Sequence, residues 1–373
     1  MTDGTARTAE DVAARATRLF SAGIRLLQVR ERGLGDPVLL DAVERAARSA
    51  RGSGATVLVN DRVDVARLAG TGVHVGDEDL PASVARALLL PGAPIGVSTH
   101  DAGAARSAFS DPACDYVAFG PVFESPTKTG RAARGVEALA LVARDRTKPL
   151  VAVGGITPER LDSVLDAGAD SAAVVGALAP EARLEENARR LLDRARRRDP
   201  PGRIFLVGFM GAGKTAVGRR VADRLGIPFV DLDTEIERTS GLTVRAIFET
   251  SGEAAFRERE AAFLEGTRAL PNAVVSTGGG SYVSESNRKT IAALGTAVHL
   301  DVPFDVVRRR LAGKTDRPLF VNDAQAAALS AERETFYRMA PVRVSLTGTE
   351  SIEESADKLL SAVYDRRELG VSL

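Results

Sequence analysis

The stretch Ile204-Phe205-Leu206-Val207-Gly208-Phe209-Met210-Gly211-Ala212-Gly213-Lys214-Thr215 decides the fold of the second half of the chain. Its first four residues are apolar and predict a buried parallel strand, and the apolar residues after it have helical spacing: Val217, Val221 and Leu225. The residues between strand and helix match the pattern G-x-x-x-x-G-K-[ST]. Glycines let backbone N–H groups surround phosphate oxygens at the start of a helix, while Lys214 reaches the outer phosphates and Thr215 ligates Mg²⁺. The sequence therefore predicts a nucleotide site.

The composition is ordinary for a globular protein, with 44% apolar and 27% charged residues. At 373 residues the chain is long enough for two domains. Basic and acidic residues balance at 50 each, so charge gives no reason to expect a nucleic acid or an anionic membrane as a partner. Cys114 is the one cysteine, which excludes an internal disulfide, and no apolar run is long enough to span a membrane. We expect a cytoplasmic protein with small-molecule substrates.

A boundary between two domains is expected near residue 200. The segment from 180 to 198 has the apolar spacing of one amphipathic helix, and it ends in Arg196-Arg197-Arg198. Basic residues suit the carboxyl end of a helix, and Pro200-Pro201-Gly202 cannot continue it. The predicted domains are therefore residues 1–199 and 203–373.

Seven short β-type runs alternate with helical stretches before that boundary, at residues 26–30, 57–60, 73–75, 95–98, 116–119, 150–153 and 172–175. Repeated βα units predict a parallel sheet, either doubly wound or closed as a (β/α)₈ barrel. Polar residues and glycines follow six of the runs, at the edge where barrels assemble their active sites. We therefore predict an α/β protein: a TIM barrel followed by a P-loop domain with a parallel sheet in three α/β/α layers.

Six motifs of the first 198 residues resemble those of thiamine-phosphate synthase, in the right order: residues 28–32, 59–64, 72–81, 96–100, 120–128 and 153–156. That family joins a hydroxymethylpyrimidine diphosphate to a thiazole phosphate and releases pyrophosphate. The resemblance implies that Asp61 and Asp79 hold Mg²⁺. It implies pyrimidine diphosphate contacts from Gln28, Val29, Arg30, Glu31, Arg32, Asn60, Ser98 and Lys128. It implies thiazole phosphate contacts from Ser125, Pro126, Thr127, Gly155, Val175 and Gly176.

Two positions depart from the pattern of that family, because Arg32 stands where a lysine is usual and Gly176 where a serine is usual. A related thiazole tautomerase shares the barrel and is the competing enzyme, and a non-catalytic scaffold is the alternative of another class. Paired carboxylates favour the synthase, since they suit Mg²⁺ and a diphosphate and have no evident use in a tautomerase. His74 and His100 have no obvious partner, so we interpret both as structural.

Downstream of the P-loop, the predicted strand at 229–233 ends in Asp231 and Asp233, which lie on one face because they are two residues apart. One carboxylate can organise Mg²⁺ while the other orients or deprotonates an acceptor hydroxyl. Arg257 follows in the segment 252–260, and a predicted strand at 274–277 ends in three glycines. Together with the segments 317–319 and 332–337, these motifs resemble shikimate kinase over residues 203–368.

The second resemblance implies transfer of a phosphoryl group from ATP to shikimate. It implies shikimate contacts from Asp233, Arg257, Gly279 and Arg333, and catalytic roles for Asp233, Lys214 and Arg317. It implies an ATP site made of Gly211, Ala212, Gly213, Lys214, Thr215, Ala216, Arg310 and Arg317, with Mg²⁺ organised by Thr215 and Asp231. Two arginines suit an acidic substrate, because a guanidinium group matches a carboxylate. Two alternatives are a simple ion pair between Arg257 and Glu260 along a helix, and another small P-loop kinase such as gluconate kinase.

The first strand of the barrel is missing from the sequence pattern. Seven runs are found where eight strands close a barrel, and Met1-Thr2-Asp3 leads almost directly into a helical stretch at 9–22. Thr2 and Asp3 resemble the end of the strand with which synthases of that family open. We expect either that translation starts upstream or that exposed strand edges impair this half of the chain while the P-loop half stays intact.

Overall fold

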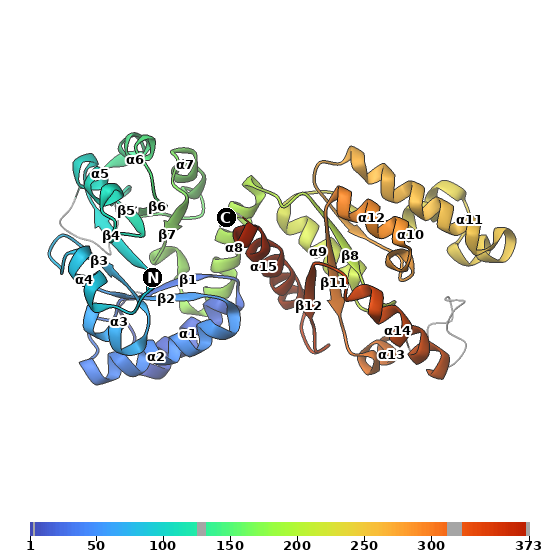
Figure 1. Ribbon diagram of the computed structural model, residues 1–373, viewed down its shortest axis with the longest axis horizontal. Coiled ribbons are helices and arrows are strands. Elements are labelled where there is room, and N and C mark those ends of the chain that lie inside the picture. Colours follow the sequence, from blue (N-terminus) through green and yellow to red (C-terminus); the bar gives the residue numbers. More distant parts are fainter. Residues whose placement is uncertain (3, 125–131, 312–322, 371–373) are drawn as a thin grey trace. The chain divides into compact units, whose positions relative to one another are not determined.

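The chain folds into two compact units, Met1–Ala195 and Arg196–Leu373. The structure is a computed structural model that describes residues 1–2, 4–124, 132–311 and 323–370 (Figure 1). The division falls inside helix α8 (Leu184–Arg198). The domain limits expected from the sequence, 1–199 and 203–373, remain a prediction about which segments fold independently.

The first unit is built on seven parallel strands that pair in chain order. They are β1 (Leu26–Val29), β2 (Thr56–Asn60), β3 (Gly72–Val75), β4 (Ile95–Thr99), β5 (Tyr116–Phe119), β6 (Leu150–Val153) and β7 (Ser171–Ala173). This is the barrel-type sheet that the sequence predicts. The last strand ends two residues earlier than expected, because Val175 already leads into the 3-10 turn η1 (Gly176–Leu178).

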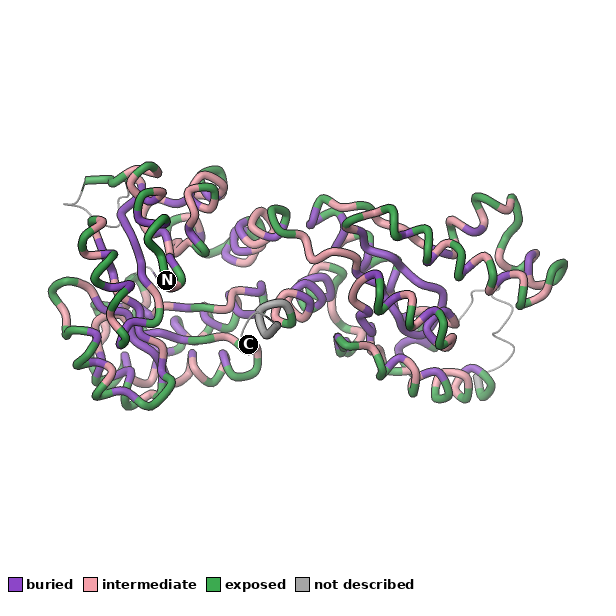
Figure 2. Tube along the Cα trace, turned by 45° about the horizontal axis from the view of Figure 1, so that its top comes forward, coloured by how far each residue is buried: buried purple, intermediate pink, exposed green. Residues whose placement is uncertain are grey.

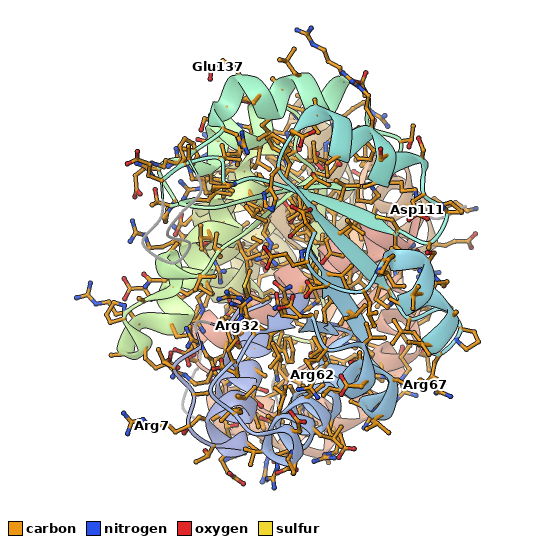
Figure 3. The ribbon with its side chains drawn as sticks, turned by 90° about the vertical axis from the view of Figure 1, so that its left-hand side faces the viewer. Arg7, Arg32, Arg62, Arg67, Asp111 and Glu137 are labelled. Carbon is orange, nitrogen blue, oxygen red and sulfur yellow. The ribbon has the colours of Figure 1, made fainter. Side chains whose placement is uncertain are left out.

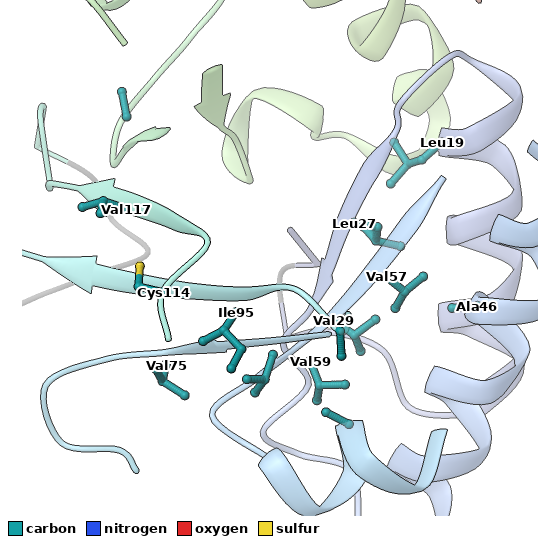
Figure 4. Packing of buried hydrophobic residues seen from close by; sticks show 14 of the residues in the cluster. Leu19, Leu27, Val29, Ala46, Val57, Val59, Val75, Ile95, Cys114 and Val117 are labelled. Carbon is teal, nitrogen blue, oxygen red and sulfur yellow. The ribbon is translucent and has the colours of Figure 1, made fainter. Parts of the chain in front are cut away.

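Helices cover the outer face of this sheet (Figure 1): α1 (Ala9–Ser21), α2 (Asp36–Ser53), α3 (Val63–Ala69), α4 (Ala82–Leu88), α5 (Ala102–Ser110), α6 (Gly135–Arg144), α7 (Leu161–Asp166) and α8. The first helix begins with a capping box, in which Thr8 and Asp11 each bind the other's backbone N–H. Alternate strand residues face the helices, so Val57 and Val59 pack with Leu19 of α1 and Ala46 of α2 (Figure 4). The opposite face of the strands carries polar side chains such as His74 and Ser98 beside the buried Leu58 and Ala118.

The start of the chain lies between the carboxyl ends of β1 and β7. The amino group of Met1 donates to the carbonyl of Val174 (3.2 Å), and the N–H of Thr2 donates to the carbonyl of Gln28 (2.9 Å). The Thr2 hydroxyl accepts from the N–H of Arg30 (2.8 Å) and its side chain is fully buried. Thr2 thus has the position expected for the end of a strand between β1 and β7. Leu26, at the amino end of β1, is 47% exposed, so this apolar side chain is only partly covered there.

The second unit has five parallel strands in the order β12-β11-β8-β10-β9. These strands are β8 (Arg203–Val207), β9 (Phe229–Asp231), β10 (Ala273–Ser276), β11 (Thr296–Asp301) and β12 (Val342–Ser345). Its helices are α9 (Lys214–Leu225), α10 (Leu232–Ser240), α11 (Val244–Gly266), α12 (Glu285–Leu294), α13 (Phe304–Leu311), α14 (Asp323–Tyr337) and α15 (Ile352–Gly370). The strand predicted at 229–233 is wrong in its last two residues, because Asp231 caps α10 and Asp233 lies in the first turn of that helix.

Helices pack on both faces of this second sheet, which confirms the three predicted layers. In β8, Ile204 and Leu206 join the apolar cluster with α9 and α15, whereas Phe205 and Val207 join the cluster on the other face. Figure 2 shows the buried strands of each unit between more exposed helices. Within the described ranges, no helix is both long and apolar enough to cross a membrane. The expected cytoplasmic location remains a prediction.

Candidate active sites

The P-loop connects β8 to α9 and has the conformation that its glycines permit. Gly211 and Gly213 have φ values of 78° and 97°, where other residues are strained, and a Cβ atom at Gly211 would come within 3.0 Å of Leu311. The buried ammonium group of Lys214 donates to the loop carbonyls of Gly208 (2.8 Å) and Phe209 (3.0 Å). Arg310 of α13 lies beside the same loop, with Nη1 3.4 Å from the carbonyl oxygens of Gly211 and Ala212.

Thr215 and Asp231 meet next to the loop. The Thr215 hydroxyl, at the start of α9, donates to Oδ2 of Asp231 at the end of β9 (2.8 Å). The Oδ1 atom of Asp231 caps α10 by accepting from the N–H of Thr234 (3.3 Å). A hydroxyl oxygen and a carboxylate oxygen that lie side by side are suitable ligands for Mg²⁺. This pair therefore fits the predicted metal site of the P-loop half.

Three charged side chains converge on the glycines that follow β10. A Cβ atom at Gly278 would lie 3.0 Å from Oδ1 of Asp233, and one at Gly279 would lie 3.6 Å from Nη1 of Arg333. A Cβ atom at Gly280 would overlap the guanidinium group of Arg257. Small residues thus let a carboxylate and two guanidinium groups approach one short segment. The structure brings together the four residues for which the sequence implies a common ligand.

Buried partners fix these groups in place. Arg257 donates to Glu260 (3.0 Å), and the fully buried Glu260 also accepts a hydrogen bond from the Ser281 hydroxyl. The Tyr337 hydroxyl donates to the carbonyl of Gly279 (2.5 Å), and burial raises the pKa of Tyr337 to about 12. Tyr337 and the buried Arg333 are one helical turn apart on α14. The helix that carries Arg333 is therefore tied to the glycine segment.

Two carboxylates meet at the carboxyl ends of β2 and β3. Asp61 follows β2 with a φ of 65°, and its N–H donates to the carbonyl of His74 (2.8 Å). Asp79 accepts from the N–H of Gly76 (2.7 Å). Burial raises the pKa of Asp61. A hydrogen bond with Asp79 and the negative charge of Asp79 raise that pKa further. A carboxyl group whose ionisation is opposed by burial and by a neighbouring carboxyl group fits a divalent cation, which would balance the negative charge.

Basic and amide side chains surround this pair of carboxylates. Arg32 lies 3.4 Å from Oδ2 of Asp61, near the middle of the face in Figure 3, while Arg67, Asp111 and Glu137 lie at the rim. Burial and the nearby Arg32 both lower the pKa of Arg30, so positive charge is concentrated there. Gln28 donates to Asn60 (3.1 Å). A site that combines a cation-binding pair of carboxylates with arginines suits a diphosphate.

The other residues predicted for the barrel site fall into three groups: side chains that point away from the site, glycines at its edge, and residues outside the described ranges. The side chains of Val29 and Glu31 point elsewhere, because Val29 belongs to the apolar core and the buried Glu31 accepts from the N–H of Ala6 (3.2 Å). Gly155, with a φ of 64°, packs against Glu124, and Gly176 begins η1 directly after Val175. Five predicted site residues lie outside the described residues: Ser125, Pro126, Thr127, Lys128 and Arg317.

Comparison with known proteins identifies the two halves. The family model for thiamine monophosphate synthase matches residues 1–178, and that for shikimate kinase matches residues 210–364. A thiamine-phosphate synthase of Myxococcus xanthus is 45% identical over 48% of this chain and 83% of its own length. A shikimate kinase of Halorhodospira halophila is 44% identical over 40% of this chain and 86% of its own length. The chain belongs to both families. It is a fusion, and these matches do not support a tautomerase, a scaffold or another kinase.

A solved thiamine phosphate pyrophosphorylase from Pyrococcus furiosus is 26% identical to this chain. It aligns with 49% of this chain and 88% of that protein, with a TM-score of 0.45.

The two histidines of the synthase half have partners, contrary to the expectation from the sequence. His74 lies 2.8 Å from the Ser98 hydroxyl and 2.7 Å from the Tyr116 hydroxyl. His100 lies 2.5 Å from the carbonyl of Gly120 and 3.6 Å from Asp77. The partners of His74 are 24 and 42 residues away in sequence, and only the pairing of β3, β4 and β5 brings them together.

Sequence reasoning missed the contact of Glu260 with Ser281 and the role of Tyr337 in the kinase half. The ion pair of Arg257 with Glu260 exists, as the simpler interpretation expected, yet Arg257 also lies against Gly280. The two interpretations are thus compatible. A signal was present for Tyr337, because it is four residues after Arg333 on one helical face. No local signal predicts that Ser281 reaches Glu260, since the two residues belong to different elements.

Proposed function

We propose that the chain catalyses two separate transfers. The kinase half moves the γ-phosphoryl group of ATP to the 3-hydroxyl of shikimate. The synthase half joins hydroxymethylpyrimidine diphosphate to thiazole phosphate, forming thiamine phosphate and pyrophosphate. The observation that carries the kinase proposal is the convergence of Asp233, Arg257 and Arg333 on the glycines 278–280. The synthase proposal rests on the paired Asp61 and Asp79 beside arginines.

In the kinase half, Arg257 and Arg333 bind the carboxylate of shikimate, because two guanidinium groups can neutralise and orient it. Asp233 then accepts the proton of the 3-hydroxyl as its oxygen bonds to the γ-phosphorus and the bond to ADP breaks. Lys214 leaves the loop carbonyls and neutralises the phosphates, with Arg310 and Arg317 beside the nucleotide. Catalysis is mainly positioning and charge neutralisation.

In the synthase half, Arg30, Arg32 and Lys128 stabilise the charge that develops on the diphosphate as its bond to the pyrimidine methylene carbon breaks. The thiazole nitrogen supplies the electron pair for the new C–N bond. The electron pair of the broken C–O bond leaves with pyrophosphate. No protein nucleophile is needed. Gln28, Asn60 and Ser98 orient the pyrimidine diphosphate, while Ser125, Pro126, Thr127, Gly155, Val175 and Gly176 hold the thiazole phosphate.

Both halves are proposed to use Mg²⁺, held by Asp61 and Asp79 in the synthase half and by Thr215 and Asp231 in the kinase half. When bound, the ion supplies positive charge to phosphate oxygens. The support in each half is a pair of oxygen ligands that lie within hydrogen-bond distance of each other.

The test is an assay of both reactions with one purified chain and Mg²⁺. We expect ADP formation that depends on shikimate, and pyrophosphate release only when the pyrimidine diphosphate and the thiazole phosphate are both present. Phosphorylation of gluconate without activity on shikimate would overturn the kinase proposal. Isomerisation of a thiazole without the pyrimidine substrate, and without pyrophosphate release, would overturn the synthase proposal.

A further inference from the structure

Three neighbouring strands of the synthase half place His74, Gly96 and Tyr116 in one row. His74 of β3 is the register partner of Gly96 in β4, and Gly96 is the register partner of Tyr116 in β5. This row lies on the strand face turned away from the helices, because the flanking residues Val73, Val75 and Val117 belong to the apolar core. A Cβ atom at Gly96 would overlap the Tyr116 ring. The glycine therefore lets Tyr116 cross β4 and reach His74.

Tyr116, His74 and Ser98 form a continuous line of hydrogen bonds. The Tyr116 hydroxyl lies 2.7 Å from Nδ1 of His74, and Nε2 of His74 lies 2.8 Å from the Ser98 hydroxyl. The two rings are stacked, with centroids 5.6 Å apart. Ser98 is two residues after Gly96, so it is on the same face and closer to the carboxyl end of β4. The line thus runs from the barrel interior towards the proposed substrate site.

The direction of these hydrogen bonds follows from the proton that the buried Tyr116 hydroxyl keeps. Burial raises the pKa of Tyr116, so the phenol keeps its proton, and a buried O–H group needs an acceptor. In the part of the chain that the structure describes, Nδ1 of His74 is the hydrogen-bond partner of this hydroxyl. If Nδ1 carried a proton, the phenol would have no acceptor. Nδ1 therefore accepts, and the imidazole proton is on Nε2.

The tautomer of His74 in turn fixes the role of Ser98. With its proton on Nε2, His74 donates to the Ser98 oxygen, so the hydroxyl proton of Ser98 is free to be donated elsewhere. We propose that Tyr116 and His74 are positioning residues that hold Ser98 as a hydrogen-bond donor to the pyrimidine diphosphate. The atom that accepts is a ring nitrogen or a diphosphate oxygen. This inference rests on the proposed synthase reaction.

The first test reads the tautomer directly, without substrate. The chain has three histidines, so ¹⁵N-labelled histidine gives few resonances, and loss of one set in His74→Gln assigns those of His74. We expect a protonated Nε2 and an unprotonated Nδ1. Tyr116→Phe should shift the Nδ1 resonance more than that of Nε2, because it removes the hydrogen bond to Nδ1. A proton on Nδ1 in the wild-type chain would overturn the inference.

The second test separates positioning from a merely structural role. His74→Leu removes the donor to Ser98, and we expect the KM for the pyrimidine diphosphate to rise about three- to tenfold, the effect of one neutral hydrogen bond. The KM for thiazole phosphate and the kinase activity should not change. His74→Gln keeps an acceptor and a donor, so it should recover most of the lost affinity. Equal damage in the two variants, or an unchanged KM in a folded His74→Leu, would overturn the inference.

Two ligands distinguish the acceptor atoms. Ser98→Ala should weaken binding of inorganic pyrophosphate if the acceptor is a diphosphate oxygen, or of unphosphorylated hydroxymethylpyrimidine if it is a ring nitrogen. Unchanged binding of both ligands would overturn the donor role of Ser98. A wild-type chain that makes no thiamine phosphate would overturn the proposed function and this substrate contact. The resonances of His74 would still decide the direction of the hydrogen bonds.

Discussion

The two active sites of this chain balance their charges in opposite ways. In the kinase half, two of the cationic groups have internal partners, because Arg257 pairs with Glu260 and Lys214 donates to the loop carbonyls. In the synthase half, like charges are close together, since burial and then Asp79 raise the pKa of Asp61, while burial and then Arg32 lower the pKa of Arg30. The kinase site is therefore organised before its ligands arrive, whereas the synthase site holds repulsion that its ligands relieve.

The largest expected effect is a selective loss of one activity. Asp233→Asn cannot accept the proton of the shikimate hydroxyl, so we expect kcat of the kinase to fall about 10²–10⁴-fold. Lys214→Ala should be similarly inactive, because the phosphates lose their cation. The synthase activity of the same chain is the internal control for concentration and folding. Equal loss of both activities would contradict the independence of the two sites.

A smaller effect is expected when the internal organisation of the kinase site is broken. Arg333 is buried next to Gly279, so Arg333→Ala should weaken shikimate binding by about 2–4 kcal/mol, measured as a rise in KM. Arg338→Ala is the matched control, because Arg338 directly follows the end of α14, is exposed and pairs with Glu334. If both variants raise the KM for shikimate equally, Arg333 does not contact the substrate.

The repulsion in the synthase half predicts a stability that depends on pH and Mg²⁺. Because the pKa of Asp61 is raised in the folded state, its contribution to stability is lost as pH rises through that value. Mg²⁺ should restore about 1 kcal/mol, or 2–4 °C in the melting temperature of this half, at neutral pH and less at acidic pH. Calorimetry of the wild-type chain and Asp61→Asn measures this difference. A magnesium effect that survives in Asp61→Asn would place the ion elsewhere.

The sequence predicted those features that depend on neighbours in the chain. The P-loop and the three glycines are contiguous motifs, and each has the position that its spacing implied. The shared strand face of Asp231 and Asp233 was wrong, because β9 ends at Asp231 and Asp233 lies in the first turn of α10. The register between strands has no such local signal, so the contacts of His74 with Ser98 and Tyr116 were missed. The alternation of β1 could have shown that Val29 faces the core, because side chains two residues apart share a face.

The smallest expected effect is on the free energy of unfolding, which should change with pH in opposite directions when Glu350 of the kinase half and Asp61 of the synthase half are replaced. In the kinase half, the Glu350 side chain is buried, which opposes its ionisation, but Lys358 and the N–H groups of Thr347 and Gly348 donate to it and hold its pKa below the ordinary value. A lowered pKa means stability that is present above the ordinary value of about 4.3 and lost as pH falls below it. Glu350→Gln should therefore destabilise the kinase half by about 1 kcal/mol at neutral pH, with a difference from wild type that shrinks in acid.

Asp61→Asn should change the free energy of unfolding of the synthase half with the opposite pH dependence, because the pKa of Asp61 is raised. Lys289→Ala is a surface control for the kinase half, since its pair with Glu285 is exposed and contributes little. The measurement is the free energy of unfolding of each half from pH 8 down to about pH 2, so that it covers the range below 4.3 in which the Glu350 contribution is lost, compared as variant minus wild type. If both differences change with pH in the same direction, the contrast between an internally paired site and a repelling one does not extend to the stability of the two halves.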